Sequence, residues 1–350
     1  MARVSVIMPA YNASQTIGRA LESLRNQTYQ DIEIIIVNDG STDGTLEVIQ
    51  EIARMDSRIV IVNQSNSGPG FARNAGLNKA GGEFVYFMDS DDTIDTDLIY
   101  TCVDYMTESN LDLLVFGFSI SDEHAVEVEN VSFDDYLVTN KEELALAYVP
   151  NFLMSRHGNG FLWNKFYRRD IIEDNSIRFG TDNIMEDELF NLDYIHHVSR
   201  CRFIGETFYN YFWTEPTSIR SKYNPTYLIS IKKVYDRFML LKNDLRIEGE
   251  TFDKVVISRT WNGLLVHLYE NLSKCNPPIA SLDIIKSFKQ VSIDSTFQDV
   301  ARFRFYLGKL RVIETCLYYS IKWNSAFLFL LSLRVYRILQ PLKSFIRSHV

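Results

Sequence analysis

The sequence predicts an α/β fold: a mostly parallel sheet with helices on both faces, followed by an α-helical C-terminal region. Within the first 92 residues, short apolar runs of the kind buried inside parallel sheets alternate with apolar residues at helical spacing. Each apolar run ends in a cluster of polar, turn-forming residues. After about residue 227 the strand-like patterns stop and helical spacing takes over.

The individual elements follow from the same patterns. At the start, strands are predicted over residues 4–8, 32–37, 59–62 and 84–88, and helices over 17–24, 46–53, 71–80 and 93–106. Farther along, strands are predicted over 111–118, 163–167 and 201–213, a helix over 186–197, and an exposed irregular segment over 121–143. A boundary near residue 225 is expected to divide a domain of residues 1–225 from a helical region of residues 226–350.

The charge of the chain excludes one class of function. The 350 residues include 36 basic and 45 acidic ones, a net charge of −9, whereas a general nucleic-acid binder needs a basic surface to neutralise phosphates. The charge is unevenly distributed: residues 301–350 carry nine basic residues and one acid, so this segment is +8 and the first 300 residues are −17. Such an asymmetry indicates an interaction surface in the C-terminal segment.

The thiols and the N-terminus favour a cytoplasmic protein. The four cysteines form no CxxC pair and have no histidine at metal-ligand spacing, which is typical of reduced, buried thiols. The apolar run before Pro9 is too short for a secretory signal, and the longest apolar run, residues 326–333, is shorter than a membrane span. The cysteines are Cys102, Cys201, Cys275 and Cys316.

Polar residues follow each of the first four predicted strands. Because the carboxyl ends of parallel strands share one edge of a sheet, and ligands bind at that edge, we expect these residues to face one crevice. They are Tyr11 and Asn12, Asn38 and Asp39, Gln64 to Asn66, and Asp89 to Asp92.

Three carboxylates follow the fourth strand in the motif Asp89-Ser90-Asp91-Asp92. Like charges this close raise one another's pKa unless a cation joins them. Mg²⁺ and Mn²⁺ prefer oxygen ligands and often bind substrate phosphates as well, so a divalent ion of this kind is the expected partner. The alternative is a solvated acidic turn before the next helix, but a position at the tip of a buried strand favours the metal.

Two further turns have both a ligand-binding and a structural interpretation. Asp39 can accept a hydrogen bond from a base or a ribose hydroxyl, or it can cap the following helix, as can Asp43. Gly68 and Gly70 precede a helix that carries Arg73 one turn in, and the N-terminus of such a helix favours anions. The spacing does not match a P-loop, because no Lys-Ser or Lys-Thr follows.

Together, four motifs resemble family 2 glycosyltransferases of the GT-A fold, which is Rossmann-like. The motifs cover residues 4–93 in the order and spacing of that family, with a weaker continuation to about residue 220. The resemblance implies an inverting, metal-dependent transfer of a hexose from a nucleotide sugar, with UDP as the favoured nucleotide. It assigns residues 1–110 to nucleotide-sugar binding and 111–225 to the acceptor side and the catalytic base. The motifs are residues 6–12, 37–43, 70–76 and 89–92.

The resemblance also implies a role for each matching residue. The ion, Mn²⁺ or Mg²⁺, would bridge the diphosphate and bind Asp91 together with Asp89, whereas Asp92 is left outside this assignment. The nucleotide-sugar contacts are Pro9 and Tyr11 bordering the uracil, Asp39 at the base, Asn66 and Arg73 fixing the nucleotide, and Asp89 facing the ribose.

Farther along, residues 183–190 resemble the family's Glu-Asp motif, whose Asp is the catalytic base. An inverting transfer requires a carboxylate beside the acceptor hydroxyl, on the face opposite the departing diphosphate. Asp187 is the predicted base, and Glu186 is predicted to orient it or to bind the acceptor. The alternative is structural, because acidic residues at the start of a helix also stabilise the helix dipole.

Two more segments resemble family motifs. Trp163-Asn164-Lys165 resembles a motif near the acceptor site, where Trp163 would offer a flat apolar face to a sugar ring; a position in the core is the alternative. Residues 217–220 resemble a segment that closes over the diphosphate, with Arg220 as the charge clamp. The Gln-x-x-Arg-Trp motif of processive synthases is absent, which favours the addition of one or a few sugars.

The sequence also fits two other functions. Residues 88–93 also fit the DxDx[TV] pattern of haloacid-dehalogenase-type phosphatases, in which Asp89 would be the nucleophile, although that motif normally follows the first strand and here follows the fourth. The second alternative is a catalytically silent scaffold that binds a nucleotide sugar. Under the leading hypothesis, the acceptor is a hydroxyl of a cell-envelope, capsular or other glycan, or of a lipid-linked glycan.

The basic C-terminal segment has two interpretations. Residues 323–339 are apolar, with Arg334 and Arg337 near their end, which is typical of a helix that lies on an anionic membrane. Alternatively, the segment packs against the catalytic domain or within a homodimer. The first interpretation predicts a peripheral protein on the inner face of the plasma membrane.

Overall fold

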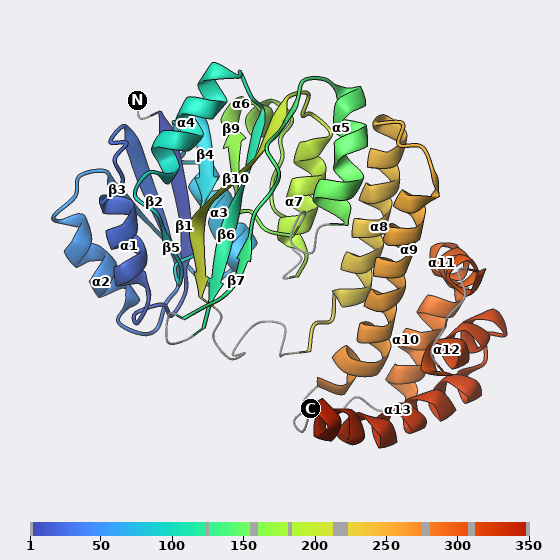
Figure 1. The fold of residues 1–350 in the computed structure, drawn as a ribbon. Helices are drawn as coiled ribbons and strands as arrows, with labels where there is room; N and C mark the ends of the chain where they lie inside the picture. Colours follow the sequence, from blue (N-terminus) through green and yellow to red (C-terminus); the bar gives the residue numbers. More distant parts are fainter. Residues whose placement is uncertain are drawn as a thin grey trace. The chain divides into compact units, whose positions relative to one another are not determined.

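A ten-stranded sheet organises the N-terminal part of the chain in this computed structural model (Figure 1). The structure describes residues 3–347 except 123–125, 155–159, 181–183, 213–222, 275–280 and 307–311. The described residues form two compact units. Unit 1 comprises residues 3–212 and 240–247, and unit 2 comprises residues 223–239 and 248–347. The domain boundary predicted near residue 225 stays a prediction.

The sheet of unit 1 is mostly parallel in its first half, as the alternating pattern predicts. Its main path runs in the order β3-β2-β1-β4-β9-β6-β10-β5, while β7 pairs with β6 and β8 pairs with β10. The pairs β1–β2, β2–β3, β1–β4 and β6–β10 are parallel, and β9 lies antiparallel between β4 and β6. The strands are β1 (Val4–Ala10), β2 (Ile32–Asp39), β3 (Ile59–Gln64), β4 (Phe84–Phe87), β5 (Thr93–Ile94), β6 (Leu113–Ser121), β7 (Glu127–Val131), β8 (Tyr136–Val138), β9 (Lys165–Arg168) and β10 (Cys201–Phe212).

Helices cover both faces of this sheet, because the central strands are apolar on both sides. Their bounds confirm the predicted alternation of strands and helices over the first 92 residues. The helices assigned to unit 1 are α1 (Ile17–Arg25), α2 (Thr45–Ala53), α3 (Pro69–Leu77), α4 (Leu98–Glu108), α5 (Lys141–Tyr148), α6 (Arg169–Asp174) and α7 (Glu186–Ile195), with a π-helical turn at Val149–Leu153.

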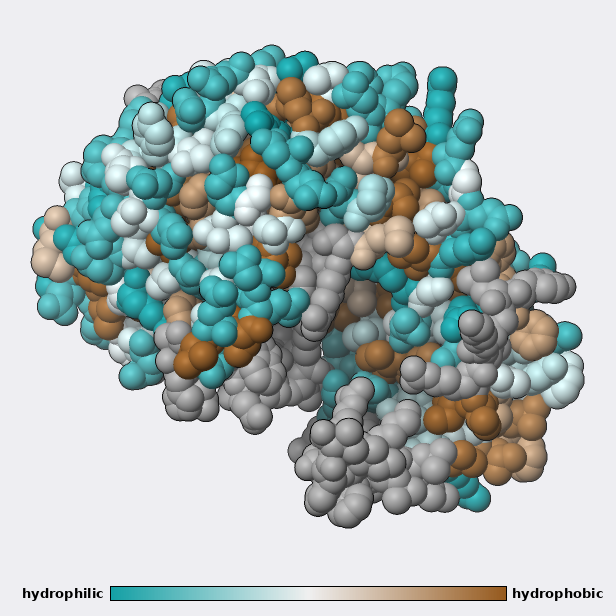
Figure 2. All heavy atoms as spheres, viewed as in Figure 1, coloured by the Kyte–Doolittle hydropathy of each residue, from teal (hydrophilic) through white to brown (hydrophobic). Residues whose placement is uncertain are grey.

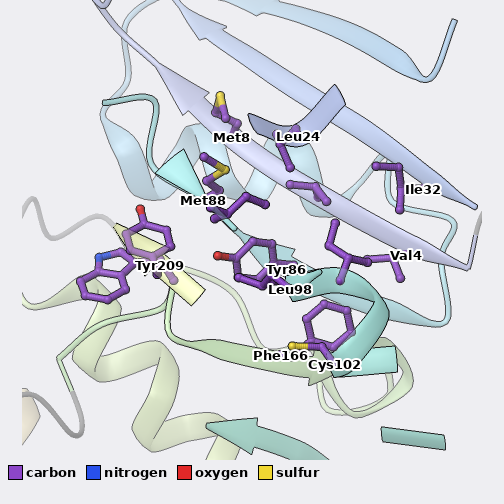
Figure 3. Close-up of a cluster of buried hydrophobic side chains, with 14 of the residues drawn as sticks. Val4, Met8, Leu24, Ile32, Tyr86, Met88, Leu98, Cys102, Phe166 and Tyr209 are labelled. Carbon is purple, nitrogen blue, oxygen red and sulfur yellow. The ribbon is translucent and has the colours of Figure 1, made fainter. Parts of the chain in front are cut away.

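Alternate residues of the central strands face the two helical layers. Met8 and Tyr86 belong to the main core, which includes buried residues of α1, α2 and α4 and extends to Tyr209 (Figure 3). Phe87 faces the other way and contacts Phe179 and Phe190 at ring-centroid distances of 5.5 and 5.4 Å. Phe190 belongs to α7, and Ile7, which alternates with Met8 along β1, packs against Gly76 of α3. The helices α3 and α7 therefore share one face of the sheet, with Gly70 of α3 close to Glu186 of α7.

The close packing of α3 on β1 explains one glycine of the predicted turn-and-helix motif. A Cβ on Gly76 would lie 2.4 Å from Ile7 Cγ2, which is closer than two carbon atoms can approach. Gly76 therefore lets α3 lie directly on the sheet, with Arg73 one turn earlier on the same helix.

Several bounds differ from the sequence prediction, each for a tertiary reason. Residues Thr93–Ile94 form β5 instead of starting a helix, because they pair with Tyr209 and Asn210 of β10. The segment predicted to be irregular contains β7 and β8, whose partners are β6 and β10. Three of the five β7 side chains are polar and none is buried, so the strand lacks the apolar pattern that predicts buried strands.

Unit 2 is helical within its described residues, as the pattern after residue 227 predicts. Among all described residues, no helix has the length and apolar character needed to cross a bilayer. Cys102 and Cys201 are buried free thiols, Cys316 is a half-buried one, and Cys275 lies outside the described residues. The helices are α8 (Tyr227–Asp244, whose last turn is assigned to unit 1), α9 (Glu250–Leu265), α10 (Ser281–Ile293), α11 (Ser295–Tyr306), α12 (Val312–Lys322) and α13 (Ala326–Arg347), with a π turn at Val266–Glu270 and a 3₁₀ turn at Asn271–Lys274.

Candidate active site

The carboxyl ends of β1, β2, β3 and β4 lie at one edge of the sheet, because these four strands are parallel. Hydrogen bonds join the loops that follow them. The Asn12 side chain accepts a bond from the Thr42 backbone N–H at 2.8 Å, and the Asn12 backbone N–H donates to Ser41 at 3.1 Å. Tyr11 and Asn66 are exposed at this edge, and Pro9 is half-buried. The structure therefore brings the predicted strand-end residues to one side of unit 1.

Asp39 ties the end of β2 to the glycine-containing turn before α3. Its Oδ1 accepts bonds from Gln64 Nε2 at 2.7 Å and from the Ser67 backbone N–H at 2.9 Å, and its Oδ2 accepts one from the Gly68 backbone N–H at 2.8 Å. The carboxylate is buried, and Gly68 has a φ of 95°, which favours glycine. Asp39 thus shapes the turn that leads into α3. The contact with the start of the helix after β2 comes instead from Asp43, whose Oδ1 accepts a bond from the Thr45 backbone N–H at 3.1 Å.

Arg73 joins the two acidic motifs of the site. Its Nη2 lies 3.1 Å from Asp89 Oδ1, and its Nη1 lies 2.8 Å from Asp187 Oδ1 and 3.7 Å from Glu186 Oε1. Burial alone would lower the pKa of Arg73, but the charges of Asp187, Asp89 and Glu186 outweigh burial and raise it. The guanidinium therefore stays charged and links the end of β4 to the start of α7. Sequence reasoning placed Arg73 at the nucleotide and missed this link, because the partners lie 16 and 114 residues away.

Asp187 has the electrostatic character of a general base. Desolvation of the carboxylate is the main cause that raises the pKa of Asp187, to about 7. The charge of Arg73 opposes this rise, and the charges of Glu186 and Asp89 add to it. A carboxylate with a pKa near the working pH combines a useful ionised fraction with the ability to take up a proton. The side chain keeps 30% of its surface exposed, so an acceptor can reach it.

The three carboxylates after β4 have different surroundings. One oxygen from each of Asp89, Asp91 and Asp92 lies within 4.8 Å of the others. Asp91 is exposed at the surface, yet neighbouring atoms displace water around it, and this desolvation together with the charge of Asp89 raises the pKa of Asp91 to about 6. Asp92 is fully buried, and both of its oxygens accept hydrogen bonds from β10. The donor set fits a hard divalent cation, with Asp89 and Asp91 as the accessible ligands.

The segment Trp163-Asn164-Lys165 is buried beside this region. The Trp163 ring stacks on Tyr209 at 4.3 Å and on Phe161 at 4.4 Å, so the structure favours the core alternative for this side chain. Lys165 is 1% exposed and donates to Phe161 O and Asn164 Oδ1 at 2.6 and 2.9 Å. Desolvation lowers the pKa of Lys165 to about 7, and the charge of Asp187 opposes that shift.

One predicted site residue cannot be placed. Arg220 lies in the segment 213–222, outside the described residues. Asn183, at the start of the Glu-Asp motif, also lies outside them, in the segment 181–183. A residue that sequence reasoning missed is Tyr209, whose hydroxyl donates to Asp92 Oδ2 at 2.6 Å. Only the aromatic character of the predicted strand 201–213 hinted at it, because the contact joins residues 117 positions apart.

Comparisons with known proteins agree with the motifs. Residues 5–176 match the family model Glycosyl transferase family 2. The chain is 28% identical to the uncharacterized glycosyltransferase EpsJ of Bacillus subtilis, over 93% of this chain and 94% of that protein. It is 36% identical to an uncharacterized glycosyltransferase of Haemophilus influenzae, over 43% of this chain and 67% of that protein.

A solved structure shares the fold. The crystal structure of S. aureus TarS in complex with UDP matches 96% of this chain and 91% of that chain with a TM-score of 0.65 at 20% identity. TarS has also been solved in complex with UDP-GlcNAc, with a TM-score of 0.61 to this chain. Neither the phosphatase nor the silent scaffold considered from the sequence is needed to explain these matches. The chain belongs to glycosyl transferase family 2, has the GT-A fold with additional C-terminal helices, and is a glycosyltransferase.

Proposed function

We propose that this enzyme is an inverting, metal-dependent hexosyltransferase that moves a sugar from a UDP-linked donor to a hydroxyl group of a glycan. The observation that carries the proposal is the Arg73 bridge, in which Nη2 contacts Asp89 of the predicted metal motif and Nη1 contacts Asp187, the predicted base. Transfer with inversion requires a base near the donor site, on the face of the sugar opposite the leaving diphosphate, and the bridge brings the predicted base and the predicted metal motif into one site.

The donor is proposed to bind along the carboxyl edge of the parallel strands. The complexes of TarS with UDP and UDP-GlcNAc support a UDP-sugar, since TarS shares the fold. The bonds that Asp39 accepts from the next loop would hold its carboxylate in place for the base. The proposed contacts are Pro9 and Tyr11 at the uracil, Asp39 at the base, Asn66 and Arg73 at the nucleotide, Asp89 at the ribose, and Arg220 as a clamp on the diphosphate.

A divalent cation, Mn²⁺ or Mg²⁺, is proposed to bind Asp91 and Asp89. These carboxylates have surface exposed to solvent at the strand-end edge. Desolvation and the charge of Asp89 raise the pKa of Asp91, and the charge of Arg19 offsets this rise only in part. When bound, such an ion supplies positive charge to the diphosphate as it leaves. The protein prepares the site by holding the two carboxylates on one short loop after β4.

Asp187 is proposed to take the proton of the acceptor hydroxyl. The hydroxyl oxygen then forms the new bond to the anomeric carbon, while the bond from that carbon to the diphosphate breaks and its electron pair leaves with the diphosphate. Arg73 holds Asp187 in place, and Glu186, which lies at 3.7 Å from the same guanidinium, orients it or contacts the acceptor.

The acceptor is proposed to be a cell-envelope, capsular or lipid-linked glycan. Residues 111–225 would form the acceptor side, in a catalytic domain that ends near residue 225. The acceptor site would be supported from the protein interior by Trp163, Asn164 and Lys165. Their side chains are buried, and Lys165 interacts electrostatically with Asp187.

We also propose that the enzyme is cytoplasmic and lies on the anionic inner face of the plasma membrane through α13. Phe327 and Leu331 are 75% and 50% exposed on one face of this helix, while Phe329 on the opposite face is fully buried and stacks on Phe288 at 4.6 Å. Figure 2 shows apolar side chains gathered over the described part of α13.

The charge around α13 favours a membrane over the alternative partner, a second copy of the chain. Residues 315–350 hold five basic residues and no acidic one. A basic helix with an apolar face suits an anionic bilayer, whereas two copies of such a helix would repel each other. The basic residues are Lys322, Arg334, Arg337, Lys343 and Arg347.

A donor screen tests the proposed reaction. The purified chain is incubated with a panel of nucleotide sugars and glycan acceptors, and release of the nucleoside diphosphate is measured with Mn²⁺, with Mg²⁺ and with EDTA. We expect metal-dependent release of UDP from one UDP-hexose, together with mass-spectrometric gain of one hexose on the acceptor. Equal release in EDTA would overturn the metal proposal, and release of another nucleotide would overturn the proposed donor.

A further inference from the structure

Asp92 differs from Asp89 and Asp91 because it is fully buried and both of its carboxylate oxygens accept hydrogen bonds from the protein. Its side chain has no exposed surface. Its Oδ2 accepts a 2.6 Å bond from the Tyr209 hydroxyl, and its Oδ1 accepts a 2.9 Å bond from the Phe212 backbone N–H. Two strong acceptor positions are therefore directed at β10 and away from the open side of the loop, where Asp89 and Asp91 have exposed surface.

Tyr209 makes a second contact with the same loop. The Asp89 backbone N–H donates a long bond, 3.4 Å, to the Tyr209 hydroxyl oxygen. One hydroxyl group thus binds both ends of the segment 89–92, as donor to Asp92 and as acceptor from Asp89. The ring itself cannot swing away, because it is fully buried and stacks on Trp163 with an interplanar angle of 7°.

Phe212, the last residue of β10, also contacts this loop. Beyond its backbone bond to Asp92, Phe212 lies under the Arg19 guanidinium at 3.9 Å from the ring centroid. The Arg19 side chain also donates to the Asp91 backbone carbonyl. Residues 89–92, here called the metal loop, are therefore held between α1 and the end of β10. These contacts do not use the carboxylates of Asp89 and Asp91.

We propose that Tyr209 and Asp92 are positioning residues, which hold the loop 89–91 in the shape that binds the divalent cation, and that Asp92 is not itself a ligand. The proposal rests on the metal dependence proposed above. Groups that orient metal ligands through hydrogen bonds typically change metal affinity about 10- to 100-fold when they are removed. The Tyr209 hydroxyl is placed to act in this way, because it bonds to the backbone of one proposed ligand, Asp89.

Tyr209→Phe tests the role of the hydroxyl. Binding of Mn²⁺ to the full chain in the presence of UDP is measured by the electron paramagnetic resonance signal of free Mn²⁺, beside thermal unfolding without metal. We expect Tyr209→Phe to weaken Mn²⁺ binding about tenfold. The matched control is Tyr194→Phe, which removes a buried hydroxyl that donates to Asp112 O at 2.6 Å, away from the metal loop. It should lower thermal stability and leave Mn²⁺ binding unchanged.

Asp92→Asn separates positioning from ligation. An asparagine removes the charge but keeps both bonds, because its Oδ1 accepts from the Phe212 N–H and its amide donates to the Tyr209 oxygen. We expect Mn²⁺ affinity within about threefold of the unmodified chain, whereas Asp91→Asn should weaken it at least 100-fold, as loss of a direct ligand to a site with few protein ligands.

The outcomes distinguish this inference from the proposed function. Equal Mn²⁺ binding by Tyr209→Phe and the unmodified chain would overturn the positioning role alone, as would a loss in Asp92→Asn as large as that in Asp91→Asn. Failure of the unmodified chain to bind Mn²⁺ with UDP would overturn the metal proposal and this inference together.

Discussion

At the residue scale, the site depends on one buried arginine placed among three carboxylates. Arg73 is nine-tenths or more buried, and it compensates Asp89 and Asp187 at hydrogen-bond distance. The positive charge of Arg73 opposes the rise in the pKa of Asp187 that burial causes. The sequence predicted Arg73 and Asp89 as contacts to the nucleotide sugar and Asp187 as the base. Their mutual contacts depend on the relative placement of α3 and α7, which no local pattern reports.

The pKa of Asp187 predicts how activity depends on pH. Only the ionised carboxylate can take a proton, and the pKa of Asp187 is raised to about 7. We therefore expect kcat/KM to reach a plateau above pH 8 and to fall about tenfold for each pH unit below 7. Initial rates at fixed metal and subsaturating donor, from pH 5 to 9, measure this limb. A rate that stays constant down to pH 5 would contradict the assignment of Asp187 as the base.

The raised pKa of Asp187 also affects the stability of the fold, which it favours at low pH, whereas activity is favoured at high pH. The folded chain binds the Asp187 proton more tightly than the unfolded chain does, because the pKa rises from 3.8 to about 7 on folding. The contribution of Asp187 to the free energy of unfolding therefore decreases as the pH rises from about 4 to 7.

Removal of the Arg73 charge should move the pH limb and destabilise the fold. In Arg73→Gln, two partly buried carboxylates lose their counter-charge, so the pKa of Asp187 rises further and the acidic limb of kcat/KM moves to higher pH. The free energy of unfolding should fall by about 3 kcal/mol, as for other broken buried pairs. Denaturant unfolding and the pH profile measure the two effects.

Arg58→Gln provides a matched control. Arg58 makes a 2.7 Å ion pair with Asp56, and both side chains are largely shielded from solvent. The pair precedes β3, at the amino ends of the parallel strands, whereas the predicted site lies at their carboxyl ends. We expect some loss of stability and an unchanged pH limb. A pH limb that stays in place in Arg73→Gln as well would show that Arg73 does not set the ionisation of Asp187.

At the element scale, the approach of α3 to β1 positions the site. Apolar periodicity predicted the strands β1 to β4 and the helices between them, because each is long enough to show a pattern. It could not predict β5, β7 or β8, which are short and owe their existence to pairing with strands far along the sequence. Tyr209 was missed for the same reason, since its partner Asp92 comes from another part of the chain.

Gly76→Ala tests the close approach of α3. The new Cβ would lie 2.4 Å from Ile7 Cγ2, so α3 must move away from the sheet and carry Arg73 with it. We expect a loss of about 1–3 kcal/mol in the free energy of unfolding, as for other overpacked sites, together with reduced kcat/KM. Denaturant unfolding and steady-state kinetics measure both.

Gly18→Ala is the control for helix propensity. Gly18 lies in α1, and a Cβ at this position would meet no atom within 4 Å. The substitution should leave activity unchanged and stabilise the chain by up to about 1 kcal/mol, because alanine favours a helix. A Gly76→Ala variant as stable and active as Gly18→Ala would show that α3 tolerates a wider separation from β1.

At the scale of the whole molecule, the charge asymmetry of the sequence separates an acidic catalytic part from a basic end. The first 300 residues are strongly acidic, so an anionic membrane would repel them, and only the C-terminal segment carries the opposite charge. The sequence predicted this asymmetry and the apolar character of the segment. Which apolar side chains are exposed could not be predicted, because it depends on the packing of α13 against Phe288 and its neighbours.

Binding to vesicles tests the membrane proposal. The full chain should sediment with vesicles that contain anionic phosphatidylglycerol and not with neutral phosphatidylcholine vesicles. The double variant Phe327→Ser, Leu331→Ser should lose most of this binding, and Arg334→Glu should weaken it at least about fivefold, since each basic residue contributes about 1 kcal/mol at such a surface. Leu146→Ser, an equally polar change at a side chain 76% exposed on α5, is the control.

A different result would identify the other partner. If the chain ignores both kinds of vesicle and light scattering shows a dimer that the double variant abolishes, the exposed face of α13 is an interface between two copies of the chain.

The central claim is that Asp187 removes the acceptor proton while the metal motif and Arg73 hold the donor. The most direct measurement compares the unmodified chain with Asp187→Asn, using the nucleotide sugar that the unmodified chain consumes. We predict that sugar transfer falls about 10²- to 10⁴-fold, as for the loss of a general base, while the affinities for UDP and Mn²⁺ stay within about threefold. Transfer by Asp187→Asn at the rate of the unmodified chain would contradict the assignment of Asp187 as the base.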